Sequence, residues 1–287
     1  MNFYLSAVLL GLGFSSLALG IFISMRIFNI PDITTDGSFT LGGAITAVLF
    51  SNHVAVLLVL PVVFICGAAA GSITGWIHTK LKVNALLAGI LVMTALYSVN
   101  LSIMGRSNIP LMNVNTMFSF FSFIIDPSLQ QVTVLLTFSF LMWAIVSRLL
   151  RTDFGLSMRA TGNNENMIRS LGVNSDRMKM IGLALANGLI AISGFLITQI
   201  QGFADINMGI GIVILGLGSV MIGEIFLRAI HVTKITWHLF AVIAGSIIFR
   251  LILAFALSIG IDALYLKLVV AVFVLIVVSI PNLKRAS

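Results

Sequence analysis

The chain has 287 residues, of which 59% are hydrophobic and only 9% are charged. About a quarter of the residues in soluble globular domains are charged, so the composition excludes that class. The formal net charge of +7 does not indicate nucleic-acid binding, because basic residues are normal in the cytoplasmic loops of membrane proteins and no soluble domain is present to carry such a site.

Apolar runs of about 20 residues recur along the sequence, and a helix of that length crosses a bilayer core of roughly 30 Å. The alternating segments of about 10 residues that are typical of a β-barrel are absent from the sequence. We therefore expect an all-α polytopic membrane protein with one transmembrane domain, residues 1–287, and about nine membrane segments (range about eight to ten). In chain order the segments are 3–25, 37–51, 54–78, 83–104, 130–149, 180–199, 209–227, 238–258 and 263–281.

The first segment begins in MNFYLSAVLLGLG. This stretch lacks the basic start and the small-residue cleavage site of a secretory signal peptide, so we expect a span that is retained.

The second and seventh segments are short and rich in glycine (SFTLGGAITAVLF and MGIGIVILGLGSVMIGEIF). Each is second in a set of four, and the two sets have opposite predicted orientations. The chain thus divides into two inverted-repeat halves, about 1–105 and 180–287, around a middle region 106–179 with an outer loop, the fifth span and a cytoplasmic loop at 151–179. Interrupted segments in matching places indicate broken or re-entrant helices at a transport site near the membrane midplane. The alternative is that their glycines only let helices pack closely.

The basic residues predict the orientation of the chain. If the loop at 151–179 is cytoplasmic, 13 of the 16 Lys and Arg residues fall inside or at the inner boundary, while Arg106 falls outside and Arg250 and Lys267 lie within spans. An excess of basic residues marks the cytoplasmic side of membrane proteins. We therefore predict a multi-pass protein of the plasma or inner membrane, with its N-terminus outside and its C-terminus in the cytoplasm.

A polar stretch, GLSMRATGNNENMIRSLGVN at residues 155–174, interrupts the apolar chain. Asn163 is a suitable N-cap, and Gly172 lies where a left-handed C-terminal residue is expected. Glu165 and Arg169 are spaced for an i,i+4 ion pair. The resulting helix of about nine residues is too short to be stable alone in water.

The same helix carries Met167, Ile168 and Leu171 on one side, flanked by Arg159 and Arg169. A short helix with an apolar side and basic flanks fits a groove in a partner protein. It equally fits the anionic inner surface of a membrane, which would use the same charges.

The order of residues in this stretch, Gly-x-x-x-Arg-Ala-x-Gly-x-Asn with Gly-Val-Asn further on, adds a resemblance. It is similar to the cytoplasmic coupling loop of permease subunits in the ABC importer family for branched-chain amino acids, ribose and related sugars. The matching residues are Gly155, Arg159, Ala160, Gly162, Asn164, Gly172, Val173 and Asn174. Asn29–Ala44 (NIPDITTDGSFTLGGA) and Leu215–Phe226 (LGLGSVMIGEIF) resemble two glycine-rich segments of the same family.

Two departures from the family pattern bear on these matches. Met167 and Ile168 stand where many relatives have two alanines, so the docking pocket on the partner can differ. The sequence GLGS at 216–219 replaces a contiguous Gly-Gly.

The resemblance implies the transmembrane permease subunit of an ATP-binding-cassette importer, which forms a translocation pathway. Few ionisable groups lie in the spans, which suits a small neutral or zwitterionic solute better than a multiply charged one. An amino acid fits the aliphatic spans better than a sugar or a nucleoside. The implied partners are an ATP-binding subunit, an extracytoplasmic solute-binding protein, a second permease chain (identical or related) and membrane lipid. ATP and Mg²⁺ would be bound by the ATP-binding subunit, so no cofactor is expected in this chain. The residues expected to couple to the ATPase are Gly155, Arg159, Ala160, Gly162, Asn164, Glu165, Met167, Ile168, Arg169, Leu171 and Gly172.

Candidates for the translocation pathway come from the two glycine-rich segments and from charged positions nearby or in later spans. They are Asp36, Ser38, Gly42, Gly43, Gly216, Gly218, Ser219, Glu224 and Arg250. The residues alone leave other roles open. Asp32 and Asp36 suit helix capping, because the stretch from Asp32 to Ser38 is rich in turn-forming residues. Glu224 is spaced for an i,i+4 pair with Arg228.

Arg250 lies near the middle of AVIAGSIIFRLILAFALSI, where a charge costs a few kcal/mol. Three interpretations are open. The side chain extends to the membrane boundary, or it pairs with an acid such as Asp32, Asp36 or Glu224, or it contacts the transported solute.

The sequence contains no GxxxxGK[ST] phosphate loop, no HExxH and no GxSxG motif, and its four histidines are scattered. Neither ATP hydrolysis by P-loop chemistry, nor a metal site, nor an intramembrane enzyme is therefore expected of this chain. A secondary transporter driven by an ion gradient is the alternative that inverted halves and broken helices also fit. The loop at 151–179 argues against it, because such a carrier needs no docking helix for an ATPase.

Overall fold

The computed structural model describes residues 3–111, 116–121, 126–230 and 232–286. It is 82% helical, which confirms the all-α fold class. In chain order the elements are α1 (Phe3–Gly13), α2 (Ser15–Ile21), the π-helix η1 (Phe22–Ile27), α3 (Thr34–Ser51), α4 (Val56–Lys80), α5 (Ala85–Met104), β1 (Asn108–Pro110), the 3₁₀-helix η2 (Met117–Phe121), α6 (Pro127–Arg151), α7 (Asp153–Asn163), α8 (Glu165–Ser170), α9 (Ser175–Gln201), β2 (Phe203–Asp205), α10 (Ile212–Ile230), α11 (Ile235–Ser258), the 3₁₀-helix η3 (Ala263–Tyr265) and α12 (Leu266–Ala286).

Six helical runs in the described residues are long and apolar enough to cross a membrane. They are Phe3–Ile27, Val56–Lys80, Ala85–Met104, Pro127–Arg151, Ser175–Gln201 and Ile235–Ser258. Two further apolar helical stretches are shorter, Ile212–Leu227 in α10 and Leu266–Ser279 in α12. A polytopic membrane protein is therefore the right class, whereas the count of about nine segments and the inverted repeat stay predictions.

Several helices begin earlier than the apolar segments that predicted them. The sixth segment was expected from residue 180, but α9 begins at Ser175, where Asn174 accepts a hydrogen bond from the backbone N–H of Arg177 at 3.0 Å. The fifth was expected from residue 130, but α6 begins at Pro127, after the N-cap Asp126. Apolarity marks only the part of a helix that lies in lipid, while the polar caps beyond it set where the helix starts.

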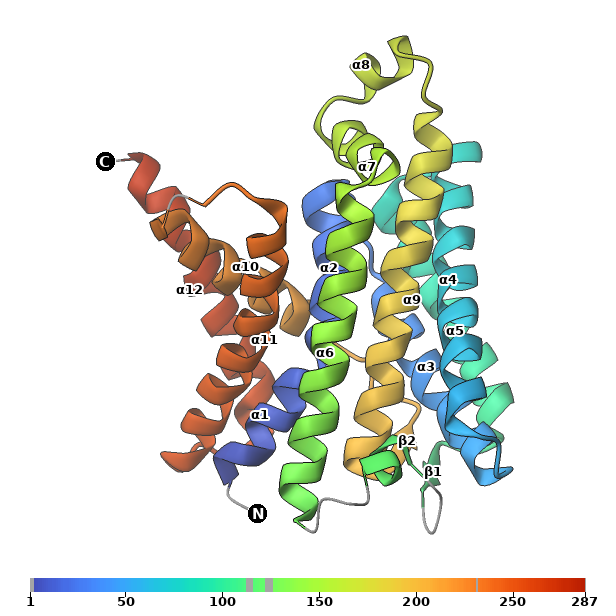
Figure 1. Cartoon of the computed structure of the whole chain (residues 1–287), viewed down its shortest axis with the longest axis vertical. Coiled ribbons are helices and arrows are strands. Elements are labelled where there is room, and N and C mark those ends of the chain that lie inside the picture. The colour runs from blue at the N-terminus through green and yellow to red at the C-terminus, as the bar shows by residue number, and fades with distance from the viewer. Residues whose placement is uncertain (1–2, 112–115, 122–125, 231, 287) are drawn as a thin grey trace.

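The helices form two groups that are joined by the first span (Figure 1). In one group α9 packs against α3 and α4, and in the other α10 packs against α11 and α12. The run α1–α2 contacts both groups, through α9 on one side and α11 on the other. The first span and α9 are accordingly the most buried of the candidate spans.

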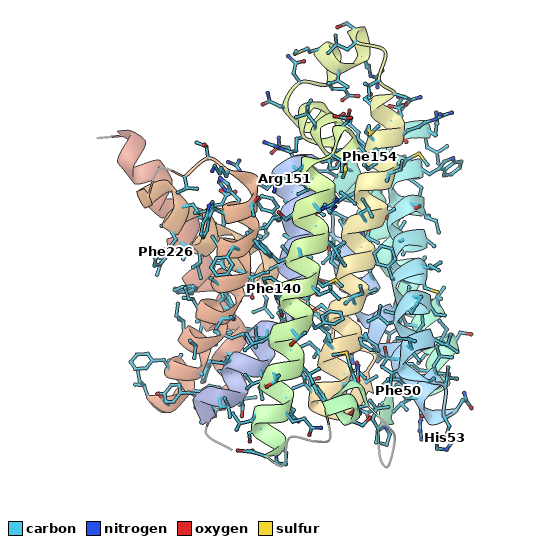
Figure 2. The ribbon with its side chains drawn as sticks, in the orientation of Figure 1. Phe50, His53, Phe140, Arg151, Phe154 and Phe226 are labelled. Atoms are coloured by element: carbon cyan, nitrogen blue, oxygen red, sulfur yellow. The ribbon has the colours of Figure 1, made fainter. Side chains whose placement is uncertain are left out.

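The two ends of the molecule differ in character. The polar helices α7 and α8 project beyond one end, while the N-terminus and the β1–β2 ribbon lie at the other (Figure 1). His53, just after α3, lies at the end away from Phe154 of α7 (Figure 2). Large apolar side chains such as Phe140 and Phe226 are exposed on the outside of the helices, as expected of a surface that faces lipid.

Candidate functional site

The polar stretch after α6 forms two helices instead of the single helix of about nine residues that the sequence predicts. Thr152 caps α7 by accepting from Gly155 N, and Asn164 caps α8 by accepting from Met167 N at 3.1 Å. The expected N-cap, Asn163, is instead the last residue of α7. The error arises because the extended backbone of Asn164 (φ −152°, ψ 95°) divides the stretch, which a helical pattern does not reveal.

An ionic cluster fixes α8 on the start of α9. Glu165 accepts from Arg169 at 2.7 Å, which confirms the predicted i,i+4 pair, and from Lys179 Nζ at 2.6 Å. Arg169 also binds Asp176 at 2.9 Å and donates to Ser175. The hydrogen bond from Lys179 is the main reason that the pKa of Glu165 is lowered to about 2. Arg169 therefore holds the loop together and is not a free basic flank.

The outer surface of α8 is apolar but narrower than predicted. Met167 and Leu171 are 59% and 67% exposed, one helical turn apart. Ile168 is buried and faces the protein. The prediction that Met167, Ile168 and Leu171 share one exposed apolar side is therefore wrong for Ile168. Gly172 has φ +84°, the left-handed conformation that its position predicted.

Two glycines of α7, Gly155 and Gly162, bring this helix close to the membrane helices. A Cβ atom on Gly162 would collide with the backbone carbonyl of Ile27 at the end of η1, and Asn29 donates to the Gly162 carbonyl at 3.2 Å. Gly155 packs in the same way on the last turn of α6. Ala160 is half-buried, and Arg159 is exposed on a cavity of about 290 Å³ that Arg26 and His238 also line.

Arg26 of η1 lies beside Glu224 of α10, with 2.5 Å between Nε and Oε1. The sequence suggested Arg228 as the partner of Glu224, but the side chain of Arg228 lies outside the described residues. Arg26 was missed because nothing local to either residue indicates a contact between segments so far apart.

A buried polar network joins the start of α3 to α9. Asp32 accepts from Thr34 N at 2.9 Å and from Asn187 Nδ2 at 2.6 Å, and Ser38 donates to Asn187 Oδ1 at 2.7 Å. All four residues are buried. Asp32 thus holds the first turn of α3, as the capping interpretation expected, and Ser38 is occupied in helix packing. Asn187 was not singled out from the sequence.

Asp36 connects the two short glycine-rich segments. Its carboxylate accepts from the backbone N–H groups of Gly211 at 2.9 Å and Val213 at 3.1 Å. It therefore caps the start of α10 rather than its own helix, α3. The beginnings of α3 and α10 meet at this residue.

The glycines proposed for the pathway lie at contacts between helices. Gly42 and Gly43 of α3 pack against α9, while Gly216 and Gly218 of α10 pack against Ile21 and Phe249. Ser219 donates to the Leu215 carbonyl of its own helix. These contacts are what the close-packing interpretation of the glycines expects.

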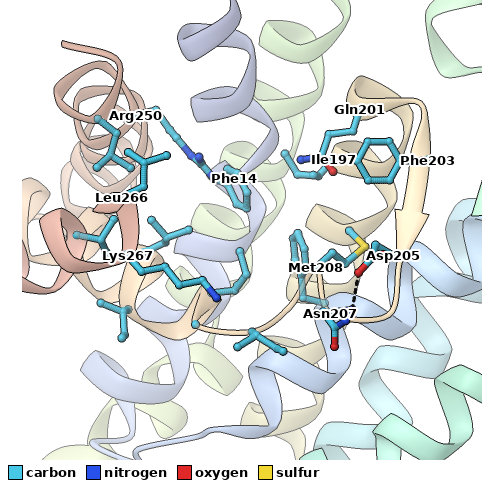
Figure 3. A pocket seen from close by; sticks show the side chains of 18 residues that line it. Phe14, Ile197, Gln201, Phe203, Asp205, Asn207, Met208, Arg250, Leu266 and Lys267 are labelled. Carbon is cyan, nitrogen blue, oxygen red and sulfur yellow. Dashed lines mark hydrogen bonds between the residues drawn. The ribbon is translucent and has the colours of Figure 1, made fainter. Parts of the chain in front are cut away.

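Arg250 lines a cavity of about 510 Å³ between α11, α12, α10 and the end of α9 (Figure 3). Its guanidinium carbon lies 4.0 Å from the centre of the Phe14 ring. Within the described part of the chain no carboxylate pairs with it, because Asp32, Asp36 and Glu224 are engaged elsewhere. Of the three interpretations that the sequence left open, pairing with one of these acids is wrong: the cation contacts an aromatic face.

Comparison with known proteins adds to this geometry. Residues 3–279 match the family described as branched-chain amino acid transport system / permease component. The chain is 37% identical to a tyrosine transport system permease protein of Clostridioides difficile (strain R20291), over 99% of this chain and 92% of the relative. It is 26% identical to the ribose import permease protein of Escherichia coli (strain K12), over 88% of this chain and 78% of the relative. It is 27% identical to a probable branched-chain amino acid transport permease protein of Methanocaldococcus jannaschii, over 64% and 62%. No solved structure matches the chain significantly.

Proposed function

Because the chain belongs to the family of branched-chain amino acid transport system permease components, we propose that it is the transmembrane subunit of an ABC importer and forms the translocation pathway for an amino acid. The preference for an amino acid over a sugar or nucleoside is supported by the 37% identity to a protein named for tyrosine transport, against 26% to one named for ribose. ATP hydrolysis then takes place in a separate ATP-binding subunit, which also holds the Mg²⁺. A solute-binding protein and a second permease chain complete the assembly.

The observation that carries the proposal is the apex formed by α7 and α8. Met167 and Leu171 expose apolar surface beyond the end of the helical bundle, and the ion pairs of Glu165 with Arg169 and Lys179 join α8 to the start of α9. A short helix with an outward apolar pair fits a groove in a partner. A carrier driven by an ion gradient needs no docking surface for an ATPase.

Motion at the apex has a route into the membrane helices. Gly162 of α7 contacts the end of η1, and Arg26 of η1 binds Glu224 of α10. Displacement of α7 by the ATPase would move η1 against α10, and Asp36 joins the start of α10 to α3. An ATP-dependent change of this kind requires that the partner bind the two conformations with different affinity.

The topology is part of the same proposal. We place α7 and α8 in the cytoplasm with the C-terminus, and the N-terminus outside, in a chain of about nine membrane segments with inverted halves. A reporter that is active only on the outer face, fused after Ser287, should be silent. An active reporter would reverse the orientation.

Co-purification tests the proposed docking surface. The chain is isolated from its host with the variant Met167→Asp/Leu171→Asp, and the bound ATPase is measured by mass spectrometry and by ATP hydrolysis. Charge on the outward side of α8 should remove the ATPase and leave folding intact, since both side chains face solvent. Leu81→Asp is the matched control, because Leu81 is 55% exposed in the turn after α4. Retention of the ATPase by the α8 variant, or substrate-driven currents from the purified chain alone, would contradict the proposal.

A further inference from the structure

Arg250 is a guanidinium within a membrane-crossing helix and has no carboxylate partner among the described residues. Placing a charge at that depth is costly, and such residues normally pair with an acid or face a water-filled cavity. Three acids inside the bundle do have partners: Asp32 is bound by Asn187, Asp36 by backbone N–H groups at the start of α10, and Glu224 by Arg26. Arg250 has no such partner among the described residues, and its guanidinium lies over the Phe14 ring.

The cavity in front of Arg250 has the size and lining of a small-molecule site. Its volume of about 510 Å³ lies within the usual range for such sites, roughly 300–1,000 Å³. Phe14, Phe39 and Leu253 supply apolar wall, and Lys267 at the start of α12 adds a second cation on the side of Arg250 (Figure 3). Asp205 of β2 lines the opposite side of the cavity (Figure 3). Cations on one side and a carboxylate on the other suit a zwitterion with an apolar body.

The position of the cavity fits the arrival of a solute. Its walls include the end of α9, the strand β2 and the start of α12, which lie toward the end of the molecule away from α7 and α8 (Figure 1). In the orientation proposed above, that end faces the solute-binding protein.

We propose that Arg250 binds the carboxylate of the transported amino acid in this cavity, while its side chain lies against the aromatic wall. The assignment rests on the proposed function and adds to it a recognition residue and a site. An anionic lipid headgroup offers the same oxyanion chemistry, so the test separates the two sources. A guanidinium suits a carboxylate because its planar N–H groups match both oxygens.

Direct binding to the purified full-length chain in lipid nanodiscs provides the test. The probe is tritiated L-tyrosine, competed by unlabelled L-tyrosine and by tyramine, which keeps the ring and the amine but lacks the carboxylate. Wild-type chain should bind L-tyrosine with an affinity at least about tenfold above that for tyramine, the discrimination expected for a hydrogen-bonded charged group.

Three variants locate the effect. Arg250→Gln should lose about tenfold or more in affinity for L-tyrosine and should no longer distinguish it from tyramine. Arg250→Lys should retain part of the preference, which shows that charge at this site matters even if Gln disturbs the fold. Arg106→Gln, a cation outside the cavity, should behave as wild type.

Other results would overturn the assignment. Unchanged discrimination in Arg250→Gln would do so, as would the absence of L-tyrosine binding by the wild-type chain. Nanodiscs with and without phosphatidylglycerol separate the lipid: if Arg250→Gln removes a response to this lipid but not L-tyrosine binding, Arg250 binds headgroups instead. Uptake of L-tyrosine by the host with and without the gene tests the proposed function separately, since its loss on deletion would stand whichever residue holds the solute.

Discussion

Arg26 and Glu224 join the first span to α10 through an ion pair at the end of the bundle that carries α7. Arg26 is half exposed, whereas Glu224 is buried. The π-helical turn η1 presents Arg26 at this point, and such turns occur often at functional sites. Gly162 of α7 contacts the end of the same π-helical turn, so the ion pair links the place where α7 packs to the glycine-rich helix α10.

A double-mutant cycle measures this link. Arg26→Gln removes a cationic partner from a buried carboxylate and should lower the free energy of unfolding by about 1–3 kcal/mol. Glu224→Gln removes the charge itself, so the double variant should be less destabilised than the sum of the single variants. Thermal unfolding of the purified chain in detergent measures the stability of each variant. Solute uptake by the host measures whether the ATPase still drives transport. Strict additivity would show that the two side chains do not interact.

Local features of the coupling region could be predicted from the sequence. The left-handed Gly172 and the Glu165–Arg169 pair depend only on residues within one or two helical turns. The helix break at Asn164 could not be predicted, because Asn163 and Asn164 are equally good caps and only packing of the preceding helix decides between them.

The contacts between distant segments could not be predicted from the sequence. Asn187 bridges Asp32 and Ser38, and Arg26 reaches Glu224, between segments that no spacing rule connects. For Arg250 the sequence left three interpretations open and did not predict the contact with the Phe14 ring, because the two residues lie in segments far apart in the chain.

The ion pairs of Glu165 with Arg169 and Lys179 should stabilise the folded protein by an amount that depends on pH only at acidic pH. The folded pKa of Glu165 is about 2, below the ordinary value of 4.5, so the stabilisation is present above about pH 4.5 and is lost as the pH falls toward 2. The difference in unfolding temperature between wild type and Glu165→Gln should be constant from about pH 8 to about pH 5 and shrink below that. A difference that changed between about pH 6 and about pH 8 would point to another titrating group.

The cap of α8 can be tested with two neighbouring asparagines. Asn164→Ala should destabilise α8 by about 1 kcal/mol, because Met167 N loses its acceptor. Asn163→Ala should be nearly neutral, since its side chain caps no helix. Hydrogen exchange of the amides in α8 reports the difference. Faster exchange in Asn163→Ala than in Asn164→Ala would mean that Asn163 caps the helix, as the sequence predicts.

Gly162→Ala should separate α7 from η1. The added methyl group meets the Ile27 carbonyl, which is backbone and cannot move aside cheaply, so a loss of about 1–3 kcal/mol is expected. Ala160→Gly, on the same helix, is the control for a change of helix propensity without a collision. Unfolding temperature and ATP-dependent uptake should both fall for Gly162→Ala. A variant as stable as wild type would place α7 further from the membrane helices than the structure has it.

Asp36 distinguishes a structural from a transport role for the junction of α3 and α10. Asp36→Ala removes the acceptor for Gly211 N and Val213 N and should cost about 1–2 kcal/mol, while Asp36→Asn keeps one acceptor oxygen and should cost less. If capping is its whole role, uptake should follow stability across the two variants, with Asp36→Asn close to wild type. Uptake is measured at equal protein levels in the membrane. An Asp36→Asn protein that is stable but transports as poorly as Asp36→Ala would mean that the carboxylate serves the pathway beyond its capping role, because the lost transport would then not follow from lost stability.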